Sequence, residues 1–137
     1  MIKSLNLTKE IDKDVKPGLN NIDYEGLNKV TNNYVQHIDC LCLDEFSFEE
    51  RNKVLVECIK KLSIGGTLNL KFVNMDLLAN KIKKCEITGQ KYSQILSKTQ
   101  SCWSELETQD VISQTKMLVK TIHHENIYSI ITLEKNQ

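Results

Sequence analysis

Residues 38–72 constrain the fold of this chain more than any other stretch, because they predict two strands joined through a helix. An apolar run over 38–46 predicts the first strand, and a helical pattern fills 47–62. A run rich in β-forming residues over 67–72 predicts the second strand. Two strands joined in this way form a βαβ unit, whose strands are parallel. The stretch therefore predicts an α/β fold with a ligand crevice at the carboxyl ends of its strands.

The helix predicted over 47–62 has signals at both ends. Ser47 and Glu50 have the spacing of an N-terminal capping box. Gly65 and Gly66 follow the helical pattern and are predicted to close it. Apolar residues at positions i, i+3, i+4 and i+7 form one stripe: Leu55, Cys58, Ile59 and Leu62.

The rest of the chain continues the alternation of strands and helices. Further strands are predicted at 5–7, 19–23, 118–124 and 127–134, with a strand fragment at 34–37. Further helices are predicted at 75–85 behind an Asn74 cap, at 90–99, and from Ser104 or Thr108 through Thr115. The order predicts a mostly parallel sheet with an antiparallel C-terminal hairpin strand. A length of 137 residues suits a single domain over 1–137.

Charge and hydropathy argue against two classes of partner. The net charge is zero, and Arg51 is the only arginine among 18 basic residues. Proteins that read nucleic acids depend on arginine, so no nucleic-acid partner is expected. No apolar run approaches the ~20 residues that span a bilayer, and the first residues lack the apolar region of a signal peptide. We expect no membrane association and a cytoplasmic location.

The five cysteines predict reduced, buried thiols rather than a metal site. Their number is odd, and most of them lie inside apolar patterns. Cys40 and Cys42 occupy alternate positions of a predicted strand and so point to one face. No C-x-x-C pair accompanies them, and no metal ligand set is predicted.

Three segments resemble the motifs of a known family. Residues 62–68, Leu-Ser-Ile-Gly-Gly-Thr-Leu, resemble a "leucine, x, proline, glycine, glycine, x, leucine" turn, with Ile64 in place of the proline. Residues 38–43 resemble a strand that opens with Asp before an apolar run. Residues 17–23 resemble a Pro-Gly turn that leads into an Asn-apolar-Asp strand. With these motifs and its element order, the chain resembles the class I S-adenosylmethionine-dependent methyltransferases, which implies a Rossmann-like sheet.

The resemblance also implies a binding site for S-adenosylmethionine. In the subgroup with the Asn-apolar-Asp strand, the closing acid grips the ribose hydroxyls, a role that falls here on Asp23. Leu7 and Thr8 lie where the family's cofactor loop begins, and Asp39 opens the strand that resembles the family's fourth. The implied cofactor-binding residues are therefore Asp23, Leu7, Thr8 and Asp39.

Asp44 and Glu45 are the predicted catalytic residues. They lie together at the end of the apolar run of the first predicted strand, where ligands bind in α/β sheets. A carboxylate pair in that position can serve as a general base or hold a substrate amine. The structural alternative is that both are loop acids near a helix start, where the helix dipole favours negative charge.

Trp103 and the histidines each allow a functional and a structural interpretation. Trp103 can cap the cleft, anchor a protein interface or pack beneath its own loop. His37, His123 and His124 can be catalytic, or they can be hydrogen-bonded residues at the surface or at a sheet edge.

The segment after Leu7 departs from the family pattern. The family has a glycine-rich loop directly after its first strand, whereas no glycine occurs here before Gly18. Glycine lets the backbone approach the ligand closely, and Thr8, Lys9 and Glu10 carry side chains into that space. Either the cofactor binds in a changed mode or the pocket has been lost.

Three functions remain open from the sequence. The first is a methyltransferase that uses S-adenosylmethionine despite the altered loop. The second is a non-catalytic relative that works as a binding or structural subunit, with a protein partner or as a homo-oligomer. The third is an enzyme that uses the crevice for another small ligand.

Overall fold

The computed structural model describes residues 1–9 and 21–136. The strands are β1 (Leu5–Leu7), β2 (Asn21–Ile22), β3 (Val35–Cys40), β4 (Leu62–Val73), β5 (Leu118–Glu125) and β6 (Tyr128–Glu134). The helices are α1 (Tyr24–Asn28), the 3-10 helix η1 (Leu43–Glu45), α2 (Phe48–Lys61), α3 (Met75–Lys83), α4 (Gly89–Lys98) and α5 (Glu105–Thr115). The start of the strand predicted at 19–23 lies outside the described residues.

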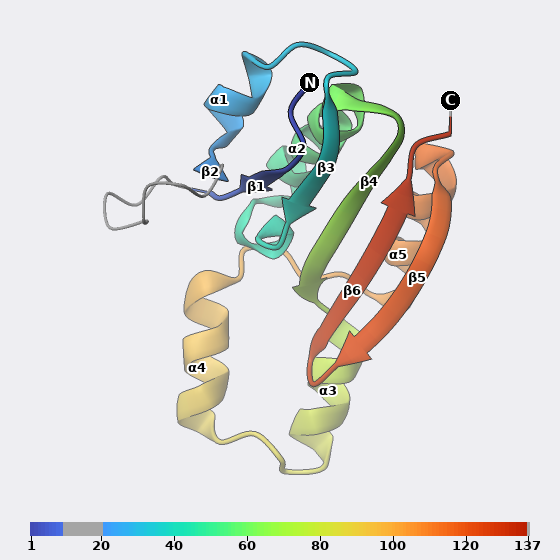
Figure 1. The fold of residues 1–137 in the computed structure, drawn as a ribbon. Coiled ribbons are helices and arrows are strands. Elements are labelled where there is room, and N and C mark those ends of the chain that lie inside the picture. Colours follow the sequence, from blue (N-terminus) through green and yellow to red (C-terminus); the bar gives the residue numbers. More distant parts are fainter. Residues whose placement is uncertain (10–20, 137) are drawn as a thin grey trace.

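The strands form one six-stranded sheet in the order β2-β1-β3-β4-β6-β5 (Figure 1). β1 pairs in parallel with β2 and β3, and β3 pairs in parallel with β4. β6 runs antiparallel to β4 and forms a hairpin with β5. The predicted α/β fold, a mostly parallel sheet with an antiparallel C-terminal hairpin strand, is confirmed. The carboxyl ends of the parallel strands meet at one edge of the sheet.

Helices α2 and α5 lie behind the sheet and cover one of its faces (Figure 1). The main apolar core lies between the two layers. The sheet contributes Ile38, Leu68, Leu70 and Ile131, and α2 contributes Val54, Leu55 and Cys58. Burying a side chain of this size contributes about 1.5–3 kcal/mol. The stripe predicted for the first helix is confirmed, because its members are buried in this core or pack against it.

β3 begins and ends earlier than the sequence predicts. Its first residues are the predicted strand fragment, and residues 41–46 leave the sheet as a turn and η1. Leu43 and Phe46 are still buried there, with exposed fractions of 0% and 4%. An apolar run marks burial whether the backbone is extended or helical, so it overestimated the length of the strand.

The glycine pair lies inside β4 instead of closing α2. Leu62 is both the C-cap of α2 and the first residue of β4. Gly65 has a φ of 84°, which a side chain disfavours, and a Cβ on Gly66 would lie 2.8 Å from the carbonyl oxygen of Ser63. The register with β3 shifts at this point. The two glycines thus permit a bulge in β4.

α3 and α4 lie beyond the carboxyl ends of β3 and β4 (Figure 1). Asn74 caps α3 as predicted, and its side chain accepts from two backbone N–H groups. The predicted capping box of Ser104 and Glu107 is present at the start of α5. α4 begins one residue earlier than predicted, because Thr88 caps it and Gly89 is its first residue.

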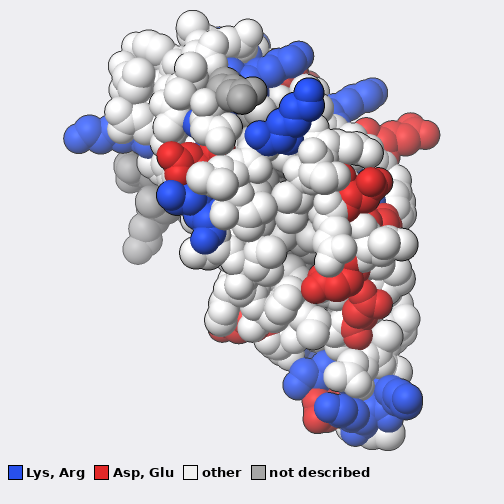
Figure 2. Space-filling model, turned by 90° about the vertical axis from the view of Figure 1, so that its right-hand side faces the viewer, with Lys and Arg blue, Asp and Glu red and all other residues white. Residues whose placement is uncertain are grey.

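The surface charge is uneven along the molecule. Figure 2 shows basic side chains gathered at its lower end, around the end of α3, with acidic side chains higher on the same face. α3 ends in Lys81 and Lys83, and Lys84 is its C-cap. Among the helices of the described residues, none combines the length and apolar character needed to cross a bilayer.

Candidate functional site

Asp44 lies in η1, just beyond the carboxyl end of β3. Its Oδ2 accepts a 2.7 Å hydrogen bond from the backbone N–H of Val73, at the end of β4. Its carbonyl oxygen accepts from the N–H groups of Gln100 (2.8 Å) and Ser101 (3.1 Å), which follow α4. Only 7% of the residue is exposed. Asp44 therefore joins the ends of two strands to the segment that leaves α4.

Burial raises the pKa of the Asp44 carboxyl to about 6, from an ordinary value of 3.8. The charge of Glu45 adds to the rise, whereas the N–H of Val73 and the ammonium of Lys71 partly offset it. A carboxyl with a pKa near the working pH is suited to accept a proton from a substrate. The two predicted catalytic acids thus differ, since Glu45 is half-buried beside this buried, perturbed group.

A cavity of about 590 Å³ opens at Asp44, between the sheet edge and α4. Its size falls within the range of about 300–1,000 Å³ that is typical of small-molecule sites. The lining residues are Leu41, Asp44, Glu45, Lys71, Val73, Lys91, Gln94, Ile95, Ser97, Lys98, Thr99 and Tyr128. Both predicted catalytic residues therefore line one cavity at the carboxyl ends of β3 and β4.

Asp23 lies at the carboxyl end of β2, where it caps α1. Its Oδ1 accepts a 2.8 Å hydrogen bond from the backbone N–H of Gly26. A Cβ on Gly26 would lie 2.6 Å from Cγ1 of Ile22, so glycine is what allows this close turn. The cap uses one carboxylate oxygen, and the second has no hydrogen bond to any residue that the structure describes.

Leu7 and Thr8 lie at the end of β1 and face different surroundings. The Leu7 side chain is 1% exposed and belongs to the main core, while its carbonyl oxygen lies 3.3 Å from the Cys42 thiol that donates to it. The Thr8 N–H donates to the carbonyl of Ile22 at 2.8 Å. The Thr8 hydroxyl is buried and has no hydrogen-bond partner in the part of the chain that the structure describes. A buried hydroxyl without a partner fits a polar ligand at this strand end.

Asp39 belongs to a row of polar side chains that crosses the sheet. Its Oδ1 lies 2.8 Å from Nε2 of His37 and accepts from the Asn69 amide at 3.1 Å. Asn69 in turn accepts from the Thr132 hydroxyl at 2.6 Å. Asn6 and Asn21 continue the same register on β1 and β2 and are joined at 2.8 Å. The structure thus places Asp39 on a sheet face, among neutral polar groups and an imidazole.

This polar row was not predicted, although the sequence carries a signal for it. Each of Asn6, Asp39, Asn69 and Thr132 stands between two apolar residues that face the core. Alternation of this kind indicates a strand with one polar face. The register that brings the four residues side by side depends on pairing between distant segments, which the pattern within one strand does not contain.

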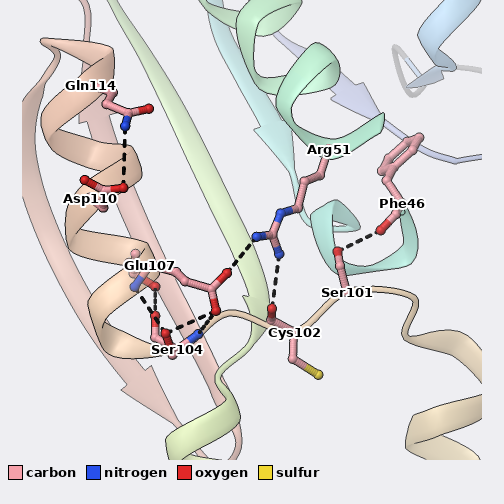
Figure 3. Close-up of polar contacts among 9 residues, drawn as sticks. Phe46, Arg51, Ser101, Cys102, Ser104, Glu107, Asp110 and Gln114 are labelled. Carbon is pink, nitrogen blue, oxygen red and sulfur yellow. Dashed lines mark hydrogen bonds and ion pairs between the residues drawn. The ribbon is translucent and has the colours of Figure 1, made fainter. Parts of the chain in front are cut away.

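Arg51 on α2 points toward the segment that links α4 to α5 (Figure 3). Its guanidinium donates to the carbonyl of Cys102 at 3.1 Å and to the Glu107 carboxylate at 3.0 Å. The guanidinium carbon lies 4.1 Å from the ring centroid of Phe48 and 4.3 Å from that of Trp103. The Arg51 contacts therefore fix the segment whose backbone holds the Asp44 carbonyl.

Trp103 packs beneath its own loop, which is one of the three alternatives given by the sequence. It is 1% exposed and stacks on Phe72, with ring centroids 4.9 Å apart.

Two of the histidines form contacts on the sheet. His37 lies in the polar row, and His124 lies between Ser129 (3.0 Å) and Glu105 (3.6 Å).

Neither a metal site nor a reactive thiol is indicated at this cavity by the residues that the structure describes. Among the described residues, no group of three His, Cys, Asp or Glu side chains is placed to hold a metal ion. The pKa of the Cys42 thiol lies well above its usual range, because the neighbouring Cys40 thiol and burial both disfavour the thiolate. Asp44 is therefore the buried group at the cavity that is suited to accept a proton near neutral pH.

The fold is similar to that of solved methyltransferases. A methyltransferase dependent on S-adenosylmethionine from Archaeoglobus fulgidus aligns at a TM-score of 0.67 and 8% identity, over 98% of this chain and 86% of its own. One from Methanosarcina mazei aligns at 0.61 and 11% identity, over 97% and 92%. A complex from Haloferax volcanii between a methyltransferase activator and a chain assigned as a methyltransferase aligns at 0.64 and 8% identity, over 99% and 83%.

Similarity in sequence does not accompany this similarity in fold. No protein-family model matches the chain, and a search of the curated proteins finds no match. Identities of 8–11% show the fold alone. The predicted methyltransferase-type, Rossmann-like fold is therefore confirmed, while the role of each site residue depends on the geometry around it.

Proposed function

We propose that this protein is a methyltransferase that uses S-adenosylmethionine and acts on a small molecule bound in the cavity at Asp44. The observation that carries the proposal is the position of Asp44. It is a buried carboxyl whose pKa is raised to about 6, and it lines a cavity at the carboxyl ends of the strands. A hydroxyl or amine acceptor loses a proton from the atom that is methylated, and a base of this kind can take it.

The proposed cofactor site lies at the ends of β1 and β2. Asp23 would hold the ribose hydroxyls through the carboxylate oxygen that does not cap α1, and the unpartnered Thr8 hydroxyl supplies a second polar contact. Leu7 contributes through its backbone, because its side chain is in the core. Asp39 completes the set from the polar row of the sheet. S-adenosylmethionine supplies an electrophilic methyl group bonded to a positively charged sulfur.

Within the cavity, Asp44 acts on the acceptor. Its Oδ2 is held by the Val73 N–H, which fixes the orientation of the carboxylate. Glu45 raises the basicity of Asp44 through its own charge. The low exposure of Asp44 keeps water from competing for the proton.

A non-catalytic subunit is the second candidate, and the segment after β1 favours it. The sequence has no glycine between Leu7 and Gly18, whereas the family's glycine loop lets the backbone approach the cofactor at this point of the chain. One oxygen of Asp23 is already committed to the cap of α1. A structurally similar chain from Haloferax volcanii occurs in complex with an activator protein, and this supports a protein partner for the second candidate.

Calorimetric titration with S-adenosylmethionine tests the proposal. The comparison is between the unchanged chain, Asp23→Asn and the control Glu25→Gln, which alters an exposed acid two residues away. Asparagine still caps the helix but replaces one acceptor oxygen by an amide donor. We expect the dissociation constant to rise about ten- to a hundred-fold in Asp23→Asn and to stay unchanged in Glu25→Gln.

Three outcomes contradict parts of this proposal. If no heat of binding is seen at about 1 mM S-adenosylmethionine, the methyltransferase proposal is wrong and the non-catalytic subunit is the remaining candidate. Equal weakening in both variants removes Asp23 from the cofactor site. Binding of a small molecule in the cavity without any cofactor binding favours an enzyme that uses the crevice for another ligand.

A further inference from the structure

Helix α4 places two solvent-exposed lysines along the wall of the cavity. Lys91, Gln94, Ile95 and Lys98 all line the cavity, and their spacing of three, four and seven residues places them on one face. Ile95 is the buried residue of this helix, whereas Tyr92 and Leu96 are 37% and 46% exposed. The face of α4 that borders the cavity therefore carries two exposed lysines on either side of its one buried residue.

A third lysine reaches the cavity from the sheet. Lys71 lies on β4, and its ammonium lies 4.6 Å from the ring centroid of Tyr128 on β6. Both residues line the cavity. The aromatic ring attracts the cation and holds it at the wall. Positive charge therefore enters the cavity from two elements, β4 and α4.

These three lysines lack carboxylate partners within the described residues. Lys60, Lys81 and Lys120 each lie within 3.3 Å of a glutamate oxygen elsewhere on the molecule. No such ion pair joins the cavity lysines to Asp44 or Glu45, the two acids of the same lining. With both acids ionised, three ammonium groups face two carboxylates. The cavity therefore carries an excess of positive charge on a chain whose net charge is zero.

The rest of the lining limits the kind of anion that fits. Leu41, Val73 and Ile95 supply apolar surface, and Tyr128 supplies an aromatic ring. A volume of about 590 Å³ is larger than an inorganic ion needs. A molecule with an apolar body and one anionic group would use both kinds of surface.

We propose that the cavity binds a small organic anion, with an apolar body and a carboxylate or phosphate group held by Lys71, Lys91 and Lys98. The inference rests on the proposed function in one respect, since it identifies this anion as the methyl acceptor. Asp44 then faces the atom of the anion that loses a proton, and the lysines bind the carboxylate or phosphate group. The binding itself needs no cofactor.

The probes are benzoate, phenyl phosphate and the neutral isostere benzamide, each titrated into the full chain without cofactor. Amide signals of α4 are followed by two-dimensional NMR. We expect saturable shifts with at least one of the two anions, at a dissociation constant below about 1 mM, and binding of benzamide that is at least about ten-fold weaker. The anion that binds more tightly distinguishes a carboxylate from a phosphate ligand.

The variants test which lysines are responsible. The double substitution Lys91→Gln and Lys98→Gln should weaken binding of the anion at least about ten-fold. The control is Lys83→Gln with Lys84→Gln, which removes the same charge from the end of α3, outside the cavity lining. The control should change the dissociation constant less than about two-fold, because both lysines lie outside the lining and salt screens exposed charges.

Three results overturn the inference. The first is equal binding of benzamide and the anions, and the second is no saturable shift with either anion at about 10 mM. The third is equal loss of affinity in the two double variants, which would assign the effect to the general charge of α3 and α4. If the anion binds and S-adenosylmethionine does not, the anion site stands and the anion is not a methyl acceptor. If S-adenosylmethionine binds and the anions do not, the proposed function stands and this inference is wrong.

Discussion

Asp44 combines a structural and a chemical role because of where its backbone and side chain point. Its carbonyl holds the segment after α4, and its carboxylate holds the end of β4. These contacts place the residue in a buried junction, and burial is the main cause of its raised pKa. The same packing that joins these segments thus produces a proton acceptor suited to near-neutral pH.

The raised pKa of Asp44 has a consequence for stability. The carboxyl ionises near 3.8 when the chain is unfolded and near 6 when it is folded. Between these values the folded state binds more protons, so the free energy of unfolding falls as the pH rises. For this one group, the fall is up to about 3 kcal/mol between about pH 4 and pH 7.

Asp44→Asn should remove this pH dependence of the free energy of unfolding, because the asparagine side chain does not ionise. Its amide oxygen can still accept the hydrogen bond from the Val73 N–H. Urea unfolding at the two pH values measures the free energy of unfolding of each protein. Glu45→Gln is the control and should retain most of the slope. Identical pH dependence in Asp44→Asn and the unchanged chain would show that Asp44 does not titrate as proposed.

The sequence predicted where the acids Asp44 and Glu45 lie, but it did not predict which of them is buried. Both follow an apolar run, and that pattern indicates a strand end. Their difference arises in η1, where one turn directs Asp44 toward the end of β4. That contact joins residues 29 positions apart, so no local pattern contains it.

The segment between α4 and α5 is held by side chains from other elements. Arg51 on α2 binds the Cys102 carbonyl and Glu107, and Ser101 donates to the Phe46 carbonyl at 2.7 Å (Figure 3). Arg51 is 4% exposed and lies between two aromatic rings. The position of α4 against the cavity therefore depends on a residue of α2.

Replacing Arg51 should destabilise the fold more than replacing its acidic partner. Arg51→Met leaves the Cys102 carbonyl without its donor and removes two cation–π contacts, so we expect a loss of about 2–3 kcal/mol. Glu107→Gln keeps the capping box of α5. It should cost less than about 1 kcal/mol, because the Glu107 side chain is 37% exposed and the ion pair is screened. Urea unfolding of both variants provides the comparison. An Arg51→Met loss no larger than that of Glu107→Gln would contradict this role.

Helix starts were predicted better than strand lengths. Ser47, Asn74 and Ser104 each cap a helix as expected, since capping depends on a residue and the next three positions. The bulge at Gly65 and Gly66 and the early end of β3 depend on pairing between strands. The lysines of α4 that line the cavity were not predicted to belong to a site, because the sequence of one helix does not show which strands it faces.

In the molecule as a whole, the candidate functional residues lie at the carboxyl ends of the parallel strands. The ends of β1 and β2 carry Thr8 and Asp23, and the ends of β3 and β4 carry Asp44 and the cavity that we propose to bind an anion. The sequence predicted that such an edge exists, because alternating strands and helices form parallel sheets. It did not predict the polar row behind the edge, since that row requires the register of β1 to β6.

NMR mapping of bound S-adenosylmethionine on the full chain tests whether this edge is a methyltransferase site. We expect the largest amide shifts at Thr8, at 22–26 and at 40–44, because these backbone segments surround the strand ends proposed to hold the cofactor. Signals of α5 and β5 should stay in place. An unchanged spectrum at about 1 mM ligand, or shifts confined to α5 and β5, would contradict the proposed site.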